Sequence, residues 1–204
     1  MKDVDDLRTE AARLTERGLS KGEVADELNV SRETADWLVD GRDTEEAGTD
    51  GGDVHVDWSA VGASSHRVAA VGTAMADLAV DAGGSPEVVV GVERAGVPLA
   101  TAVAGELDAD FATFSPRKHG WEGGSIDDLG TSFSRNFANV ADRRCCVVDD
   151  VVTSGTTLTE TVEAIRAEGG DLTSCAVLVD KRGIDDVDGV PVASLVGVTR
   201  VDTA

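Results

Sequence analysis

The residues best suited to chemistry are two adjacent aspartates, Asp149 and Asp150, which follow the apolar run Cys145–Val148. A short segment of small and hydroxyl-bearing residues comes next and opens a predicted helix. N–H groups at the start of a helix attract a phosphate dianion, and carboxylates accept hydrogen bonds from sugar hydroxyls. The spacing therefore predicts a binding site for a ribose 5-phosphate group. The residues assigned to it are Asp149, Asp150, Thr153, Ser154, Gly155, Thr156 and Thr157.

This segment resembles the signature with which type I phosphoribosyltransferases bind 5-phosphoribosyl 1-pyrophosphate (PRPP). A Walker-type loop is excluded because no Gly-Lys-Ser/Thr follows. Upstream, Gly91–Leu99 resembles the loop that holds pyrophosphate in the same enzymes. The resemblance implies that Arg94 binds the anion through charge-assisted hydrogen bonds and that Glu93 and Gly96 belong to the same site.

Between these two segments, Pro116–Gly124 resembles the mobile loop of orotate phosphoribosyltransferases. That resemblance implies that Arg117 and Lys118 bind the ligand, and that Lys118 and His119 would serve catalysis in an active enzyme. The loop departs from the family, because a second lysine is missing and Trp121 interrupts the glycine run. Losing a cation that closes over a leaving pyrophosphate weakens catalysis more than binding.

The sequence predicts no cofactor and no protein-held metal. Mg²⁺ is expected only if the ligand carries a pyrophosphate, which holds the metal partly through its own oxygens. Three cysteines lie in apolar runs without metal-ligand spacing, and we expect them to be buried and reduced.

Alternating apolar and helical patterns must position these loops. Strands are predicted over 87–92, 111–115, 145–150, 174–180 and 192–198, and helices over 62–82, 97–107 and 156–168. This βαβ rhythm favours an α/β domain with a parallel sheet flanked by helices, and the resemblance implies a type I phosphoribosyltransferase fold. The inward residues of the first of these helices are predicted to be Val68, Val71, Met75 and Leu78.

Three short helical patterns precede this domain. Ser20 and Glu23 form a capping box, Asn29 suits a left-handed helix end, and Ser31 is placed to cap the third helix. Their inward residues are predicted to be Leu7, Ala11 and Leu14, then Val24, Ala25 and Leu28, then Ala35 and Leu38. The pattern predicts a small all-α domain.

This small domain resembles the helix-turn-helix of DNA-binding regulators, in which the second helix enters the major groove. The residues that the resemblance assigns to DNA are Lys21, Ser31, Arg32, Glu33 and Thr34. The alternative is a helical dimerisation module that never touches DNA, since residues 1–45 carry seven basic and thirteen acidic groups and Trp37 suits either a core or a partner.

Composition bounds the setting of these domains. The net charge is −21 and four of the 18 basic residues are lysines, a balance that resembles proteins from salt-accumulating archaea, in which high charge aids solubility. No apolar run approaches the roughly 20 residues that cross a bilayer, so we expect a cytoplasmic protein that has no membrane partner. The predicted domains are 1–42 (helix-turn-helix), 43–53 (linker) and 54–204 (effector binding).

A helix-turn-helix joined to an altered phosphoribosyltransferase domain resembles two families. One is the purine repressor of Gram-positive bacteria, and the closer is the haloarchaeal orotate-phosphoribosyltransferase-like regulators of glucose and fructose catabolism. The resemblance implies a homodimeric transcriptional regulator that binds a promoter operator and a phosphorylated sugar or PRPP-like effector. The alternatives are an active orotate phosphoribosyltransferase, which makes orotidine monophosphate, and a purine-salvage enzyme of the same fold.

Overall fold

The computed structural model describes residues 3–40, 53–116 and 133–199. The described residues divide into a helical unit, 3–40 with 53–58, and an α/β unit, 59–116 with 133–199. The division differs from the predicted boundary because residues 54–58 belong to the helical unit.

The helical unit contains α1 (Val4–Glu16), α2 (Lys21–Glu27) and α3 (Arg32–Asp40). Ser20 and Glu23 form the predicted capping box at the start of α2. The core confirms the predicted inward faces: Leu7, Ala11, Leu14, Val24, Ala25, Leu28, Ala35 and Leu38 are all buried, and Val30 joins them. Helical period and capping chemistry therefore fix this unit locally.

The turn between α2 and α3 has the predicted chemistry. Asn29 is left-handed, with φ of 51°, a conformation that asparagine tolerates better than most residues. The N–H of Val30 donates to the carbonyl of Ala25 at 3.0 Å, and the hydroxyl of Ser31 accepts from the N–H of Thr34 at 3.1 Å. The turn and the start of α3 are thus both capped.

The α/β unit is built on a six-stranded sheet with the order β2-β1-β3-β4-β6-β5. Its strands are β1 (Val88–Val92), β2 (Asp110–Phe114), β3 (Arg144–Val152), β4 (Asp171–Asp180), β5 (Asp186–Val187) and β6 (Val190–Gly197). The strands β1, β2, β3, β4 and β6 pair with their neighbours in parallel, as predicted. The short strand β5 pairs antiparallel with β6.

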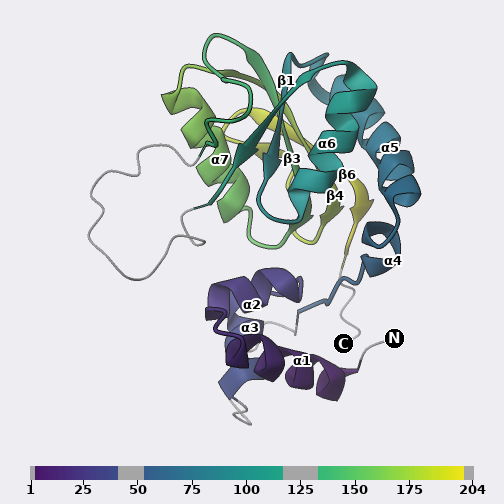
Figure 1. Ribbon diagram of the computed structural model, residues 1–204, viewed down its shortest axis with the longest axis vertical. Helices are drawn as coiled ribbons and strands as arrows, with labels where there is room; N and C mark the ends of the chain where they lie inside the picture. Colours follow the sequence, from purple (N-terminus) through teal and green to yellow (C-terminus); the bar gives the residue numbers. More distant parts are fainter. Residues whose placement is uncertain (1–2, 41–52, 117–132, 200–204) are drawn as a thin grey trace. The chain divides into compact units, whose positions relative to one another are not determined.

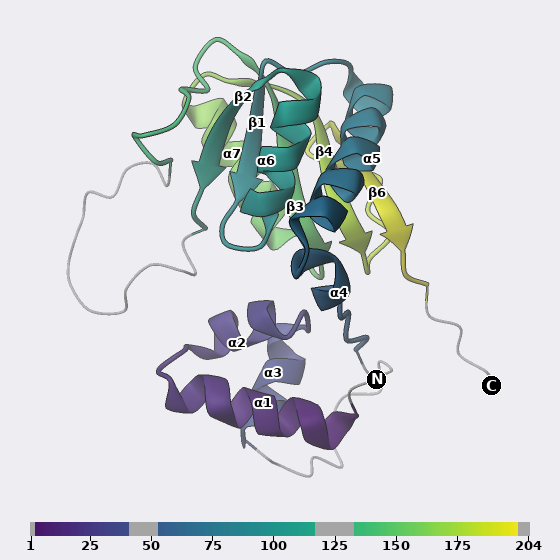
Figure 2. The same cartoon turned by 45° about the vertical axis from the view of Figure 1, so that its right-hand side comes forward.

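Four helices complete this unit: α4 (Ser59–Gly62), α5 (Ser65–Gly83), α6 (Gly96–Leu107) and α7 (Thr156–Ala167). Figures 1 and 2 show α5 and α6 on one face of the sheet and α7 on the other. All five residues of β1 are buried, as expected for a strand covered on both faces.

Helix α5 packs through smaller side chains than predicted. Met75 is buried as expected, but the other buried positions are Gly72, Ala76 and Ala79, whereas Val68, Val71 and Leu78 are half-buried. A Cβ at Gly72 would lie 2.4 Å from the Cβ of Ala102 in α6. Small residues therefore let α5 approach α6 closely, and the larger side chains lie at the margins of the contact.

The connections of the sheet reverse direction between β1 and β3. From β1 the chain runs through α6 to β2 on one side, and from β3 it runs through α7 to β4 on the other. Because crossovers between parallel strands are right-handed, the two helices lie on opposite faces. The carboxyl ends of β1 and β3 therefore flank the crevice in which open α/β sheets bind ligands.

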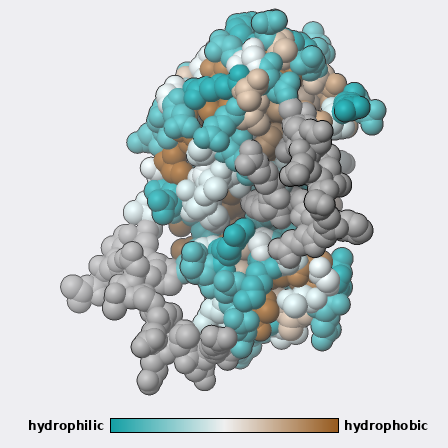
Figure 3. Space-filling model, turned by 90° about the vertical axis from the view of Figure 1, so that its left-hand side faces the viewer, coloured by the Kyte–Doolittle hydropathy of each residue, from teal (hydrophilic) through white to brown (hydrophobic). Residues whose placement is uncertain are grey.

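The described surface is largely hydrophilic on the face shown in Figure 3, with apolar patches interspersed. Within the described residues, no helix is both long enough and apolar enough to span a bilayer.

Candidate functional site

Asp149 and Asp150 lie near the carboxyl end of the central strand β3. Both are buried, with exposed fractions of 8% and 9%, and the N–H of Asp150 donates to Oδ1 of Asp149 at 2.9 Å. Buried carboxylates are costly unless they are hydrogen-bonded or paired. Two adjacent buried carboxylates near the carboxyl end of one strand therefore mark this end of the sheet as the candidate site.

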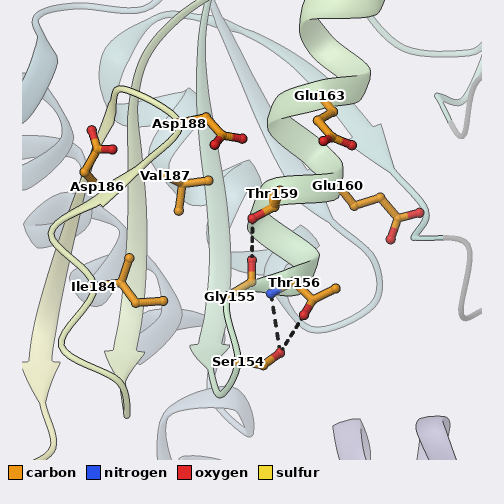
Figure 4. A pocket seen from close by; sticks show the side chains of 10 residues that line it. All are labelled: Ser154, Gly155, Thr156, Thr159, Glu160, Glu163, Ile184, Asp186, Val187 and Asp188. Atoms are coloured by element: carbon orange, nitrogen blue, oxygen red, sulfur yellow. Dashed lines mark hydrogen bonds between the residues drawn. The ribbon is translucent and has the colours of Figure 1, made fainter.

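The loop after β3 turns sharply into α7. Gly155 is the N-cap of α7 and has φ of 82°, a backbone conformation that favours glycine. The hydroxyl of Ser154 donates to Oγ1 of Thr156 at 3.0 Å and accepts from the N–H of Thr156 at 3.4 Å, contacts that Figure 4 shows. Since a glycine N-cap has no side-chain acceptor, the start of α7 presents N–H groups suited to an anion.

The second predicted loop lies directly against the first. A Cβ at Gly96, the first residue of α6, would lie 2.7 Å from the carbonyl oxygen of Val148, 3.0 Å from Cα of Asp149 and 3.1 Å from Oδ1 of Asp149. Glycine is therefore required where α6 crosses β3. Glu93 is half-buried and Arg94 is exposed in this loop, and the N–H of Glu93 donates to the carbonyl of Phe114 at 2.8 Å.

Two helix starts therefore meet the same strand end. The N-terminus of α6 lies over Asp149, and α7 begins seven residues further along the chain than Asp149, at Thr156. Each N-terminus carries about half a positive charge, which stabilises nearby anions. The structure thus brings Gly96 of the first predicted loop against Asp149, which precedes the second.

A third loop borders the site and was missed from the sequence. Asp180, buried at the end of β4, accepts hydrogen bonds from the N–H groups of Arg182, Gly183 and Ile184 at 2.7 to 3.1 Å. The side chain of Ile184 reaches Gly155, where an added Cβ would lie 2.7 Å from its Cδ1. The signal was a strand ending in aspartate, the same pattern that identified Asp149.

A cleft of about 580 Å³ lies beside the loop that joins β3 to α7, between α7 and the turn before β6 (Figure 4). Four carboxylates line it, from Glu160, Glu163, Asp186 and Asp188. Like charges repel, so this cleft is unsuited to a phosphate. The predicted loop residues Ser154, Gly155 and Thr156 line the same cleft.

Arg117, Lys118 and His119 lie outside the described residues. Among the described residues, no three histidine, cysteine, aspartate or glutamate side chains gather to hold a metal ion.

The candidate DNA interface is the outer side of α3. Arg32 and Glu33 are exposed there, and the guanidinium of Arg32 lies over α2, 3.2 Å from where a Cβ on Gly22 would be. Ser31 and Thr34 are half-buried at the helix start. The guanidinium of Arg32 therefore packs along α2, although the side chain as a whole is exposed.

Lys21, also assigned to DNA, is paired with carboxylates of the same interface. Its Nζ lies 3.3 Å from Oδ1 of Asp36 and 3.2 Å from Oδ2 of Asp40. Hydrogen bonds to Asp40 and Asp36 raise the pKa of the Lys21 ammonium. Trp37, in contrast, packs against the helical core, with the guanidinium of Arg8 4.4 Å from its ring centroid.

Comparisons with known proteins agree with this geometry. The phosphoribosyl transferase domain family matches residues 57–189. The transcriptional regulator GfcR of Halorubrum lacusprofundi is 57% identical over 99% of both chains, and that of Halobacterium salinarum is 58% identical over 98% of both. The crystal structure of Mycobacterium tuberculosis orotate phosphoribosyltransferase with inorganic phosphate is 23% identical, with a TM-score of 0.54 over 71% of this chain and 78% of that one. This likeness confirms the expected fold.

The contact at Gly96 predicts a site-specific loss of stability. Gly96→Ala should lower the free energy of unfolding by about 1–3 kcal/mol, the usual cost of forcing atoms into a packed core. Gly105 is the matched control in the same helix, because nothing lies within 4 Å of an added Cβ; Gly105→Ala should raise it by up to about 1 kcal/mol. Urea unfolding in high KCl measures both, and equal effects would contradict the packing described.

Proposed function

Because this chain belongs to the phosphoribosyltransferase domain family, and within it to the transcriptional regulators named GfcR, we propose that it binds DNA and controls transcription in response to a phosphorylated metabolite. The observation that carries the proposal is the buried carboxylate of Asp149 against the start of α6, with the buried Asp150 beside it in β3, in the same chain as a helix-turn-helix. In this proposal the crevice binds the phosphorylated metabolite, and the helix-turn-helix binds DNA.

The proposed ligand is PRPP or a phosphorylated sugar. Its phosphate binds the N–H groups and hydroxyls of residues 153–157, and Asp149 and Asp150 accept hydrogen bonds from its hydroxyls. Arg94, with Arg117 and Lys118, supplies positive charge for a second phosphate. Mg²⁺ accompanies the ligand only when it is a pyrophosphate.

On DNA, α3 lies in the major groove. Arg32 donates to a guanine and Ser31 or Thr34 contacts a phosphate, while Glu33 and Lys21 complete the interface. The proposed operators belong to genes of glucose and fructose catabolism, and the protein acts in the cytoplasm as a homodimer whose two copies of α3 read two half-sites.

The switch follows from linkage. A ligand that prefers the DNA-competent or the incompetent conformation shifts the balance between them by its difference in affinity. The alternative function, orotate phosphoribosyltransferase activity, is disfavoured by the names of the relatives. Rapid formation of orotidine monophosphate from PRPP and orotate, with Mg²⁺ in high KCl, would favour that enzyme instead.

The ligand site predicts the effect of removing both carboxylates. A double variant, Asp149→Asn with Asp150→Ala, should bind PRPP at least about tenfold more weakly, since a hydrogen bond to a charged group contributes roughly 1.5–3 kcal/mol. Calorimetric titration with PRPP and Mg²⁺ measures this. Asp171→Asn, an exposed aspartate at the start of β4, is the control. Unchanged PRPP affinity in the folded double variant would remove these residues from the site.

The DNA interface predicts a loss at Arg32. Arg32→Ala should weaken binding to a duplex selected from a random pool by about tenfold, because a bidentate contact to guanine contributes roughly 1–3 kcal/mol. Arg13→Ala is charge-matched, since Arg13 lies exposed on α1 and pairs with Glu10. Gel shifts of equal strength for both variants would exclude Arg32 from base reading.

A further inference from the structure

The segment that leaves the helical unit is fastened to the turn of the helix-turn-helix. We call residues 53–56 the strap. The carboxylate of Asp53 accepts the N–H of Ser31, Nδ1 of His55 lies 2.6 Å from the carbonyl oxygen of Leu28, and the side-chain amide of Asn29 donates to the carbonyl of Val56 at 2.9 Å. Three hydrogen bonds thus join the strap to residues 28–31. A flexible linker would not be expected to form three hydrogen bonds to one turn.

The contact of His55 defines its chemistry. A carbonyl oxygen can only accept, so Nδ1 of His55 carries the proton and donates to Leu28. Among the described residues, none hydrogen-bonds to Nε2, which is buried. The bond from Nδ1 is therefore the polar contact that holds this half-buried ring in place.

The other two contacts act on the start of α3. Asp53 places a carboxylate beside the helix N-terminus, where negative charge is favourable. Asn29 uses its left-handed backbone to make the turn and its side chain to hold the strap. Three of the four residues that form the turn between α2 and α3, namely Leu28, Asn29 and Ser31, are thus hydrogen-bonded to the strap.

Docking of the strap sets the length of the connection to the α/β unit. Two residues, 57 and 58, separate Val56 from Ser59 at the start of α4, a path of about 10 Å at most. Without the strap contacts, the path runs from Asp40, the last residue of α3, to Ser59, and reaches roughly 65 Å when extended. The three hydrogen bonds therefore convert a long tether into a short one.

We propose that Asp53, His55 and Asn29 are positioning residues, which dock the strap on the turn before α3 and so hold the recognition helix on a short tether to the α/β unit. The inference rests on the proposed function for its consequence at DNA. A short tether restricts where two copies of α3 can lie in a dimer, and binding of two linked sites depends on whether the linker geometry matches the span.

The test uses the full chain with three substitutions at or near the strap. His55→Leu removes the donor to Leu28, whereas His55→Asn retains an N–H close to the position of Nδ1. Asn29→Gly removes the amide that holds Val56 and keeps the left-handed turn. His66→Leu, an exposed histidine on α5, is the control. Circular dichroism first verifies that each variant is folded.

Distances between the units are measured with spin labels on Ala12→Cys and Ala74→Cys, two exposed positions in α1 and α5. Cys145, Cys146 and Cys175 are fully buried, and burial raises the pKa of Cys145 to about 12 and that of Cys146 to about 11, so these thiols should not label. The labelled protein is mixed with an excess of unlabelled protein, so that the distances measured lie within one copy of the chain and not between two copies.

We expect a narrow distance distribution for the parent chain, His55→Asn and His66→Leu, and a broad one reaching longer distances for His55→Leu and Asn29→Gly. Equal distributions in all five proteins would overturn the proposal. This outcome does not involve DNA, so it separates the strap from the proposed function.

Binding to selected duplexes then tests the consequence. His55→Leu and Asn29→Gly should lose about tenfold in affinity for a duplex with two half-sites and bind a single half-site as the parent does. Equal losses on both duplexes would mean that the residues merely stabilise α3, and would overturn the tether role. Failure of the parent to bind any duplex would reject the proposed function, while the distance measurement still decides the strap.

Discussion

The close contact between the start of α6 and the end of β3 is the constraint on which the site depends. Gly96 leaves no room for a Cβ between α6 and Asp149, so the positive end of a helix lies against a buried carboxylate. This contact arises because β1 and β3 are parallel neighbours whose helices leave toward opposite faces. The second buried carboxylate and the loop into α7 follow from the same strand. The proposed site for a phosphorylated ligand therefore depends on the strand order.

The negative charge of the chain disfavours binding of the helical unit to DNA. The chain has a net charge of −21, and Lys21 is held by Asp36 and Asp40 on the helix proposed to read DNA. Release of counterions by many lysines normally supplies much of the affinity for DNA, and it contributes little at high salt. Base contacts, dimerisation and the geometry of the tether must therefore supply more of the binding here than in a basic regulator.

Local patterns predicted most of this structure. The capping box of Ser20 and Glu23, the left-handed Asn29 and the buried β-branched runs predicted the helical unit and the parallel strands. The failures share one cause, which is contact between distant parts of the chain. The face of α5 depends on Ala102, the loop after β4 contacts Gly155, and the contact of His55 depends on Leu28, 27 residues away. The bounds of β5, two residues long, also lie below what periodicity can detect.

The most direct test of sensing by one unit and DNA reading by the other is the dissociation constant for a selected duplex, measured in high KCl with and without saturating PRPP or sugar phosphates. Linkage requires that a ligand which controls DNA binding changes this constant, typically by about 5- to 150-fold. The account predicts such a change with at least one of these ligands. Ligand binding that leaves the constant for DNA unchanged would contradict it.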